Sequence, residues 1–157
     1  TFDWCLRRKH LNTLTILSRW VSKTADGPLY ALLGLFLMAS QQYSLASILC
    51  CALLFERICY FFLKSHFRRN RPPQAIPGFQ SAIQPSDQFS FPSGHTSAAF
   101  LVATLSSQWL PELGAALYLW AGLVAVSRVL LGVHFPTDTV AGASLGHCIA
   151  LIALALF

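Results

Sequence analysis

The chain has 157 residues, of which 55% are hydrophobic and 11% are charged, and its formal net charge is +5 at pH 7. This composition excludes a small water-soluble globule and predicts a single domain, residues 1–157, that crosses a membrane several times. Because the basic residues border apolar segments and form no separate basic face, the charge argues against a nucleic-acid partner and favours anionic lipid. The sequence starts at Thr1 and ends inside an apolar run, so we expect it to come from a slightly longer chain.

The N-terminal residues 1–27 combine apolar and basic side chains with the spacing of an amphipathic helix. The apolar members are Trp4, Leu11, Leu14, Ile16, Leu17 and Trp20, and the basic members are Arg7, Arg8, Lys9, Arg19 and Lys23. We predict a helix that lies in the membrane interface and is broken at Asp26, Gly27 and Pro28. Asp26 is expected to cap the next helix, with a contact to substrate as the alternative.

Five apolar segments follow, at about residues 29–40, 44–63, 96–110, 113–131 and 139–157. A membrane span needs about 20 residues, so the second, fourth and fifth segments fit well and the first and third are short. Short helices can borrow flanking residues or lie where the protein thins the bilayer. The pattern predicts an all-α integral membrane bundle of about five transmembrane helices, preceded by the interfacial helix.

Polar and reactive residues inside these segments are interpreted as structural. Glu56 and Arg57 lie within the second segment, where charge is costly, so we expect a structural ion pair or a position in the wall of a pocket. Four of the five cysteines are expected to behave as small hydrophobic residues: Cys50, Cys51, Cys59 and Cys148. No Cys and His residues occur at metal-ligand spacing, so we expect neither a structural metal nor a cofactor.

The polar, proline-rich connection at residues 64–93 is predicted to be the active-site loop. It opens with Lys64, followed after six residues by Arg71 and Pro72. Cations beside a lipid surface suit an anionic head group, and arginine can hold phosphate oxygens at two points. The alternative is a positive flank that anchors a helix end.

Other titratable residues outside the spans are expected to take no part in the chemistry. Asp87, in the loop, is predicted to be solvated. Attraction to the membrane surface is enough to account for three basic residues of the loop, His66, Arg68 and Arg69. Two further histidines, His10 and His147, have no partner that the sequence reveals, so a structural role is the default.

A second motif, Phe91-Pro92-Ser93-Gly94-His95-Thr96, directly precedes the third apolar segment. Ser93 is well placed as a helix N-cap, and the free N–H groups of Gly94 and His95 would face an anion at the helix start. The alternative is an ordinary helix cap in which His95 is an interfacial side chain.

A third motif begins with Ser127-Arg128 and continues, after five residues, with His134 and, after three more, with Asp138. Pro136 suits the first turn of a new helix, so His134 and Asp138 can meet on one face. An aspartate that holds one imidazole nitrogen leaves the other free to attack an electrophile. Arg128 near a membrane end is costly without an anion, which favours a functional role.

The set KxxxxxxRP, PSGH and SRxxxxxHxxxD, from Lys64 to Asp138, resembles the signature of the type 2 phosphatidic acid phosphatase superfamily. That superfamily includes lipid phosphate phosphatases, bacterial undecaprenyl diphosphate phosphatases and soluble vanadium haloperoxidases. The resemblance implies that His134 attacks phosphorus to form a phosphohistidine, that Asp138 orients it, and that His95 protonates the leaving group. The implied phosphate-binding residues are Lys64, Arg71, Ser93, Gly94 and Arg128.

With so many donors a divalent metal is dispensable, so we expect a metal-independent hydrolase of lipid phosphates or diphosphates. Undecaprenyl diphosphate is the first candidate substrate, and phosphatidic acid or phosphatidylglycerophosphate is the second. A lipid phosphotransferase would use the same residues. A haloperoxidase is disfavoured because those enzymes are soluble, and a channel or transporter would not need this set. Oligomeric state stays open.

Two arguments disagree about the side of the membrane that the active site faces. Apart from Arg57, the basic residues fall on the active-site side, which the positive-inside rule places in the cytoplasm. The bacterial enzymes that the chain resembles commonly work on the outer face. We expect a multi-pass protein of the cell inner membrane with its site on the outer, periplasmic face.

Overall fold

The computed structural model describes residues 11–85 and 87–157, so the first ten residues of the predicted interfacial helix, with Trp4, Arg7 to Lys9 and His10, lie outside the described part. The described residues form helices and loops, without a β-strand. The helices are α2 (Leu11–Lys23), α3 (Gly27–Ala39), α4 (Tyr43–Phe67), α5 (Pro72–Ala75), α6 (Gly94–Trp109), the 3-10 turn η1 (Pro111–Leu113), α7 (Gly114–Leu130) and α8 (Pro136–Leu156). The predicted all-α class is confirmed.

Three helical stretches in the described part are long and apolar enough to cross a membrane: Tyr43–Phe67, Pro111–Leu130 and Pro136–Leu156. They coincide with the second, fourth and fifth apolar segments of the sequence. Helices α3 and α6 have 13 and 16 residues, fewer than the roughly 20 that a span needs. The integral membrane helical bundle is confirmed, while the number of five spans stays a prediction.

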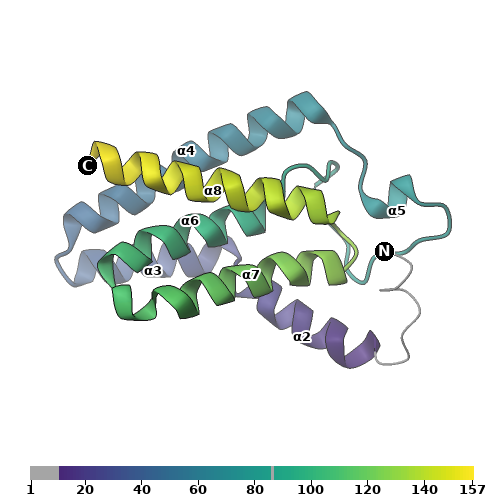
Figure 1. Cartoon of the computed structure of the whole chain (residues 1–157), viewed down its shortest axis with the longest axis horizontal. Helices are drawn as coiled ribbons and strands as arrows, with labels where there is room; N and C mark the ends of the chain where they lie inside the picture. Colours follow the sequence, from purple (N-terminus) through teal and green to yellow (C-terminus); the bar gives the residue numbers. More distant parts are fainter. Residues whose placement is uncertain (1–10, 86) are drawn as a thin grey trace.

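Helix α6 forms the centre of the bundle and packs against α4, α7 and α8; Figure 1 shows it between α8 and α7. Small residues let α8 approach it closely. A Cβ on Gly142 would lie 2.5 Å from the Ser93 carbonyl oxygen, and one on Gly146 would lie 1.9 Å from that of Ser97. The two backbones are therefore in contact at both glycines, which aligns the start of α6 with the start of α8.

The amphipathic helix α2 lies against α7. Its buried positions include the polar Ser18 and Ser22, whereas Leu17 and Trp20 are exposed. Exposed apolar side chains suit a helix at a membrane surface. The helix ends at Lys23, and α3 begins at Gly27 with Pro28 in its first turn.

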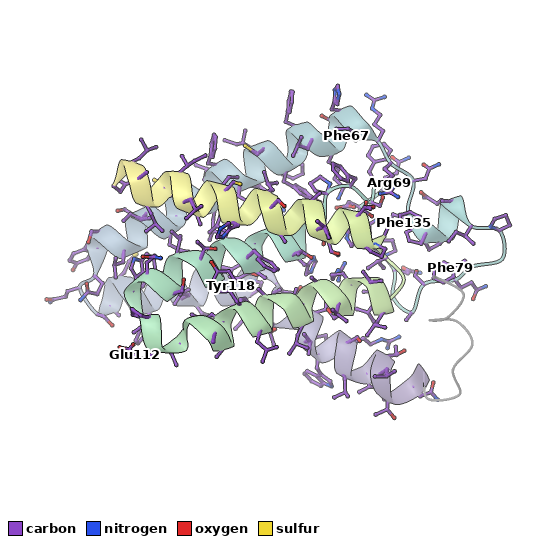
Figure 2. The ribbon with its side chains drawn as sticks, in the orientation of Figure 1. Phe67, Arg69, Phe79, Glu112, Tyr118 and Phe135 are labelled. Atoms are coloured by element: carbon purple, nitrogen blue, oxygen red, sulfur yellow. The ribbon has the colours of Figure 1, made fainter. Side chains whose placement is uncertain are left out.

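The loop that follows α4 starts later than the predicted residue 64, because residues 64–67 continue the helix. Lys64 and His66 occupy the last turn, where positive side chains complement the partial negative charge of a helix C-terminus. Arg68 then ends the helix in the left-handed conformation, with φ 45°. The end of α4 and the starts of α6 and α8 meet at the same end of the bundle, where Figure 2 shows Arg69 and Phe135, with Glu112 at the opposite end.

Candidate active site

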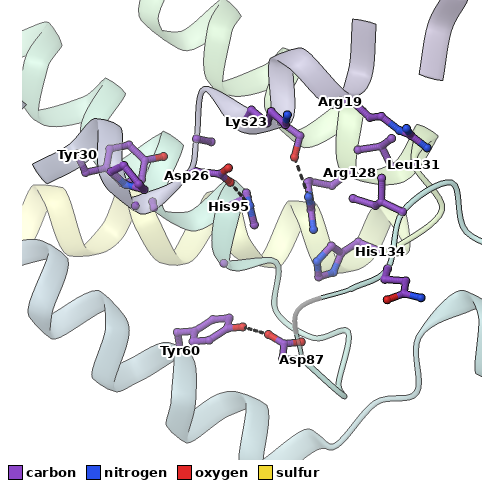
Figure 3. Close-up of a pocket in the computed structure, with 18 of the residues that line it drawn as sticks. Arg19, Lys23, Asp26, Tyr30, Tyr60, Asp87, His95, Arg128, Leu131 and His134 are labelled. Atoms are coloured by element: carbon purple, nitrogen blue, oxygen red, sulfur yellow. Dashed lines mark hydrogen bonds and ion pairs between the residues drawn. The ribbon is translucent and has the colours of Figure 1, made fainter. Parts of the chain in front are cut away.

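A cavity of about 910 Å³ opens at the loop end of the bundle. Its wall includes five residues of the sequence motifs, namely Arg71, Gly94, His95, Arg128 and His134, together with side chains of α2, α3 and α4. Figure 3 shows this cavity, with α2 and the start of α3 facing His95, Arg128 and His134. Residues separated by more than half of the sequence therefore share one wall.

His134 lies in the turn between α7 and α8 and is 2% exposed. Its Nδ1 atom is 3.8 Å from Oδ2 of Asp138, a close contact longer than a hydrogen bond. Its Nε2 atom is 3.4 Å from Nη1 of Arg71. Burial lowers the pKa of His134 to about 4. The Arg71 charge also acts to lower this pKa, whereas Asp138 acts to raise it. The imidazole is therefore neutral at neutral pH, with a lone pair available.

Asp138 is fully buried in the first turn of α8. Its Oδ2 atom accepts a hydrogen bond from the Phe135 N–H at 2.8 Å. Its Oδ1 atom accepts one from Nη1 of Arg69, also at 2.8 Å. The Arg69 guanidinium further contacts the Phe135 ring, 4.3 Å from its centroid. The interpretation of Arg69 as only a membrane-attracting residue is therefore wrong, because the loop turns back over the start of α8.

His95 lies in the first turn of α6, and its Nε2 atom is 2.9 Å from Oδ1 of Asp26. Asp26 occupies the N-cap position of α3 but makes no capping hydrogen bond with its side chain. The predicted capping role is therefore wrong. Because the turn between α2 and α3 faces the start of α6, the carboxylate points to the cavity and binds His95.

Lys64 and Arg71 converge on Asp87 from two sides. Nζ of Lys64 donates to Oδ2 of Asp87 at 2.6 Å, and the Tyr60 hydroxyl donates to the same oxygen at 2.6 Å. Nη2 of Arg71 donates to Oδ1. Lys64 and Arg71 are buried, at 6% and 2% exposure. Asp87 is thus an ion-pair partner of both cations while its side chain stays 36% exposed, so the prediction that it is solvated describes only one side of the carboxylate.

The course of the loop explains this difference. The Ser90 N–H donates to the Arg69 carbonyl at 2.8 Å, and Asn70 forms an isolated β-bridge with Phe89. These contacts fold the loop back along itself and bring Asp87 to the end of α4. Burial alone would raise the pKa of Asp87, but the hydrogen bonds from Lys64, Tyr60 and Arg71 hold it well below its usual range.

The remaining motif residues are placed around the start of α6. Ser93 holds the N-cap position, but its Oγ pairs with Oγ1 of Thr96 at 2.9 Å and makes no capping bond. Gly94 packs against the Tyr60 ring, because a Cβ added at Gly94 would lie 2.9 Å from the nearest carbon of that ring. Nη1 of Arg128 donates to Oγ of Ser22 at 2.7 Å. Its buried Nε has no hydrogen-bond partner among the described residues, so this guanidinium can donate a hydrogen bond to an anion in the cavity.

Two other interpretations concern the Glu56–Arg57 pair, of which only Arg57 lines the cavity, and His147. Glu56 is fully buried and lies 3.7 Å from Nη2 of Arg57, the contact expected of a structural ion pair. His147 is 2.9 Å from Oγ1 of Thr104 and 3.3 Å from the Tyr118 hydroxyl, as expected of a structural histidine.

Comparison with known proteins identifies relatives of this chain. The family model described as "PAP2 superfamily" matches residues 45–157. A curated protein of Arabidopsis thaliana named probable lipid phosphate phosphatase beta is 32% identical over 130 residues, 65% of this chain and 61% of that protein. The chain thus spans about three fifths of that relative's length.

Two crystal structures share the fold. Aquifex aeolicus LpxE is 29% identical, with a TM-score of 0.83 over 98% of this chain and 92% of the LpxE chain. The phosphatidylglycerolphosphate phosphatase of Bacillus subtilis, titled a transmembrane PAP2 type, has a TM-score of 0.81 at 24% identity, over 99% of this chain and 81% of its own. At 24% identity the second similarity concerns the fold alone.

Proposed function

The chain belongs to the PAP2 superfamily, and we propose that it hydrolyses a lipid phosphate or lipid diphosphate through a phosphohistidine intermediate. One observation carries this proposal. The buried, neutral imidazole of His134 lies 3.4 Å from the Arg71 guanidinium, beside a cavity that also contains His95 and Arg128. A nucleophile, an acid and cations for the equatorial oxygens are the parts that phosphoryl transfer requires.

The residues suggest a two-step reaction. Nε2 of His134 forms a bond to phosphorus while the bond from phosphorus to the leaving oxygen breaks, and His95 gives that oxygen a proton. Water then attacks the phosphohistidine, His95 takes the water proton, and the N–P bond breaks to release inorganic phosphate. Asp138, 3.8 Å from Nδ1, stabilises the positive charge that the ring acquires in the intermediate.

Arg71 and Arg128 are placed to bind the phosphoryl oxygens, together with the N–H groups of Gly94 and His95 at the start of α6. Lys64 and Ser93 complete the proposed set, although neither lines the cavity. The described residues gather no three His, Cys, Asp or Glu side chains that could hold a metal ion. In this proposal fixed cations and N–H donors neutralise the phosphate, so we expect hydrolysis that needs no metal ion.

Undecaprenyl diphosphate is the substrate that we propose first, and phosphatidic acid or phosphatidylglycerophosphate is the alternative. Three cations outside the motifs line the cavity: Arg19, Lys23 and Arg57. In a diphosphate substrate, the phosphate that does not react could bind these cations while the other phosphate reacts. The exposed apolar side chains of α4, such as Phe62, provide a surface for a long acyl or isoprenoid chain.

The site is proposed to face the outer side of the cell inner membrane. Site contacts explain two of the basic residues that argue against this: Arg69 binds Asp138, and Arg19 donates to the Ala82 carbonyl. Cysteine placed at the exposed Gln80, in a chain without its own cysteines, should react with a membrane-impermeant maleimide in intact cells. Reaction only after lysis would place the site in the cytoplasm.

The activity is tested by phosphate release from purified protein in detergent, with isoprenyl diphosphate, isoprenyl monophosphate, phosphatidic acid and phosphatidylglycerophosphate as substrates. We expect release without added metal and in the presence of a chelator. Absence of release from every lipid by folded protein would contradict the proposal.

A further inference from the structure

Asp87 lies between two cations of the proposed phosphate site and belongs to none of the three motifs. We propose that Asp87 is a positioning residue that holds Arg71 and Lys64 in the orientation that binds the substrate phosphate. This inference rests on the proposed function and concerns the same site. Its basis is the set of contacts that the Asp87 carboxylate and carbonyl make with the two cations.

The Arg71 guanidinium has two occupied edges. Its Nε donates to the Asp87 carbonyl oxygen at 3.0 Å, and its Nη2 donates to the Asp87 carboxylate. Its Nη1 donates to the Val133 carbonyl at 2.7 Å and lies 3.4 Å from Nε2 of His134. Because a guanidinium is planar and rigid, fixing Nε and Nη2 also fixes the direction of Nη1. Asp87 thereby points that nitrogen at the nucleophile.

Lys64 depends on the same carboxylate. Its ammonium group is buried and donates to Oδ2 at 2.6 Å, and Tyr60, one helical turn earlier, donates to the same oxygen. Lys64 and Arg71 carry like charges, so their approach is unfavourable unless an anion lies between them. Without Asp87, two buried cations would lack their carboxylate partner and would separate.

The position of Asp87 is itself fixed by backbone contacts. The Asn70–Phe89 bridge and the Ser90 hydrogen bond to Arg69 join the two ends of the loop close to Asp87. The carboxylate is 36% exposed, so one side of it faces the cavity. A competing possibility is that this carboxylate occupies the place of the substrate phosphate and excludes it. The two possibilities predict opposite changes in anion affinity when the carboxylate is removed.

The test measures binding of orthovanadate, a phosphate mimic, to the full chain in detergent by calorimetry, together with kcat and KM for phosphatidic acid. Asp87→Asn and Asp87→Ala should weaken vanadate binding and lower kcat/KM by about tenfold or more, the scale of one charge-assisted hydrogen bond. Asp87→Glu should recover part of both. Stronger vanadate binding in Asp87→Asn would overturn the proposal and support competition.

Two controls separate positioning from general stability. Glu112→Gln removes an exposed carboxylate at the opposite end of the bundle and should leave vanadate affinity unchanged. In an Arg71→Ala background, Asp87→Ala should have a much smaller effect than in the natural chain, because its main contact is already lost. Additive losses in this cycle would also overturn the proposal.

Vanadate binding that responds as expected in a chain without lipid phosphatase activity would contradict the proposed function and leave this role of Asp87 intact.

Discussion

Nε2 of His95 lies 2.9 Å from Oδ1 of Asp26, although 69 positions separate the two residues in the sequence. The contact joins the turn before α3 to the first turn of α6, across the wall of the cavity. Burial and the Arg128 charge lower the pKa of His95 to about 4, and the Asp26 carboxylate acts in the opposite direction, toward the protonated imidazole. The proposed acid therefore depends on a residue from the N-terminal quarter of the chain.

Asp26→Asn should lower kcat/KM for a lipid phosphate about tenfold, because His95 loses a partner for its charged form. The effect should be much smaller with p-nitrophenyl phosphate, whose leaving group needs no proton. His95→Ala should show the same dependence on the leaving group. Comparing both substrates with both variants checks this, and equal losses on the two substrates would argue for a general structural defect.

His134→Ala should reduce turnover by about 10⁴-fold or more, the scale seen when a catalytic nucleophile is removed. The variant should remain folded, as judged by its elution in detergent and its thermal midpoint. His66→Ala is a matched control, since His66 is exposed in the last turn of α4. Near-normal phosphate release from His134→Ala would show that another group is the nucleophile.

The stability of the protein should depend on pH through His134. Its pKa is about 4 in the folded chain and about 6.5 when unfolded. Between these values the unfolded state binds more protons than the folded state. The contribution of His134 to the free energy of unfolding is therefore fully present above about pH 6.5 and decreases as the pH drops toward 4. Thermal midpoints at several pH values should show a weaker fall in His134→Gln. An unchanged dependence would mean that His134 is not buried in its neutral form.

Gly146→Ala should destabilise the bundle by about 1–3 kcal/mol or more, because overpacked cores lose this much. Its Cβ would lie 1.9 Å from the Ser97 carbonyl oxygen, so α6 and α8 must separate. Gly122→Ala in α7 is the control, since no atom lies within 4 Å of the added Cβ. The control should keep or raise the thermal midpoint. Similar midpoints for both variants would show that the close approach of α8 is not required.

Prediction from sequence was most successful where the relevant residues are near one another along a helix. The separation of His134 and Asp138 by four positions, with Pro136 between them, placed both on one helical face, and the structure brings Nδ1 to 3.8 Å from the carboxylate. The apolar segments likewise predicted the three long helices, because a span needs a continuous apolar surface. Boundaries were less accurate, as the continuation of α4 through Lys64 to Phe67 shows.

Three contacts of the site are not predicted by the sequence, for a common reason. Asp87 was expected to be solvated, Asp26 to cap a helix and Arg69 to attract the membrane surface. Each is instead bound to a residue of a motif, namely Arg71, His95 and Asp138. Two of these partners come from distant helices, and the third is reached only because the loop folds back. Local patterns carry no information about such pairings.

The sequence by itself determined the membrane bundle, the family and the residues that the motifs supply. These properties depend on hydrophobicity, helical period and short fixed spacings, all of which act over a few turns of chain. Only the tertiary structure decided which carboxylates accompany those residues. The close packing of α8 on α6 at Gly142 and Gly146 and the path of the loop bring distant charges together, and burial then makes each charge depend on the partner it meets.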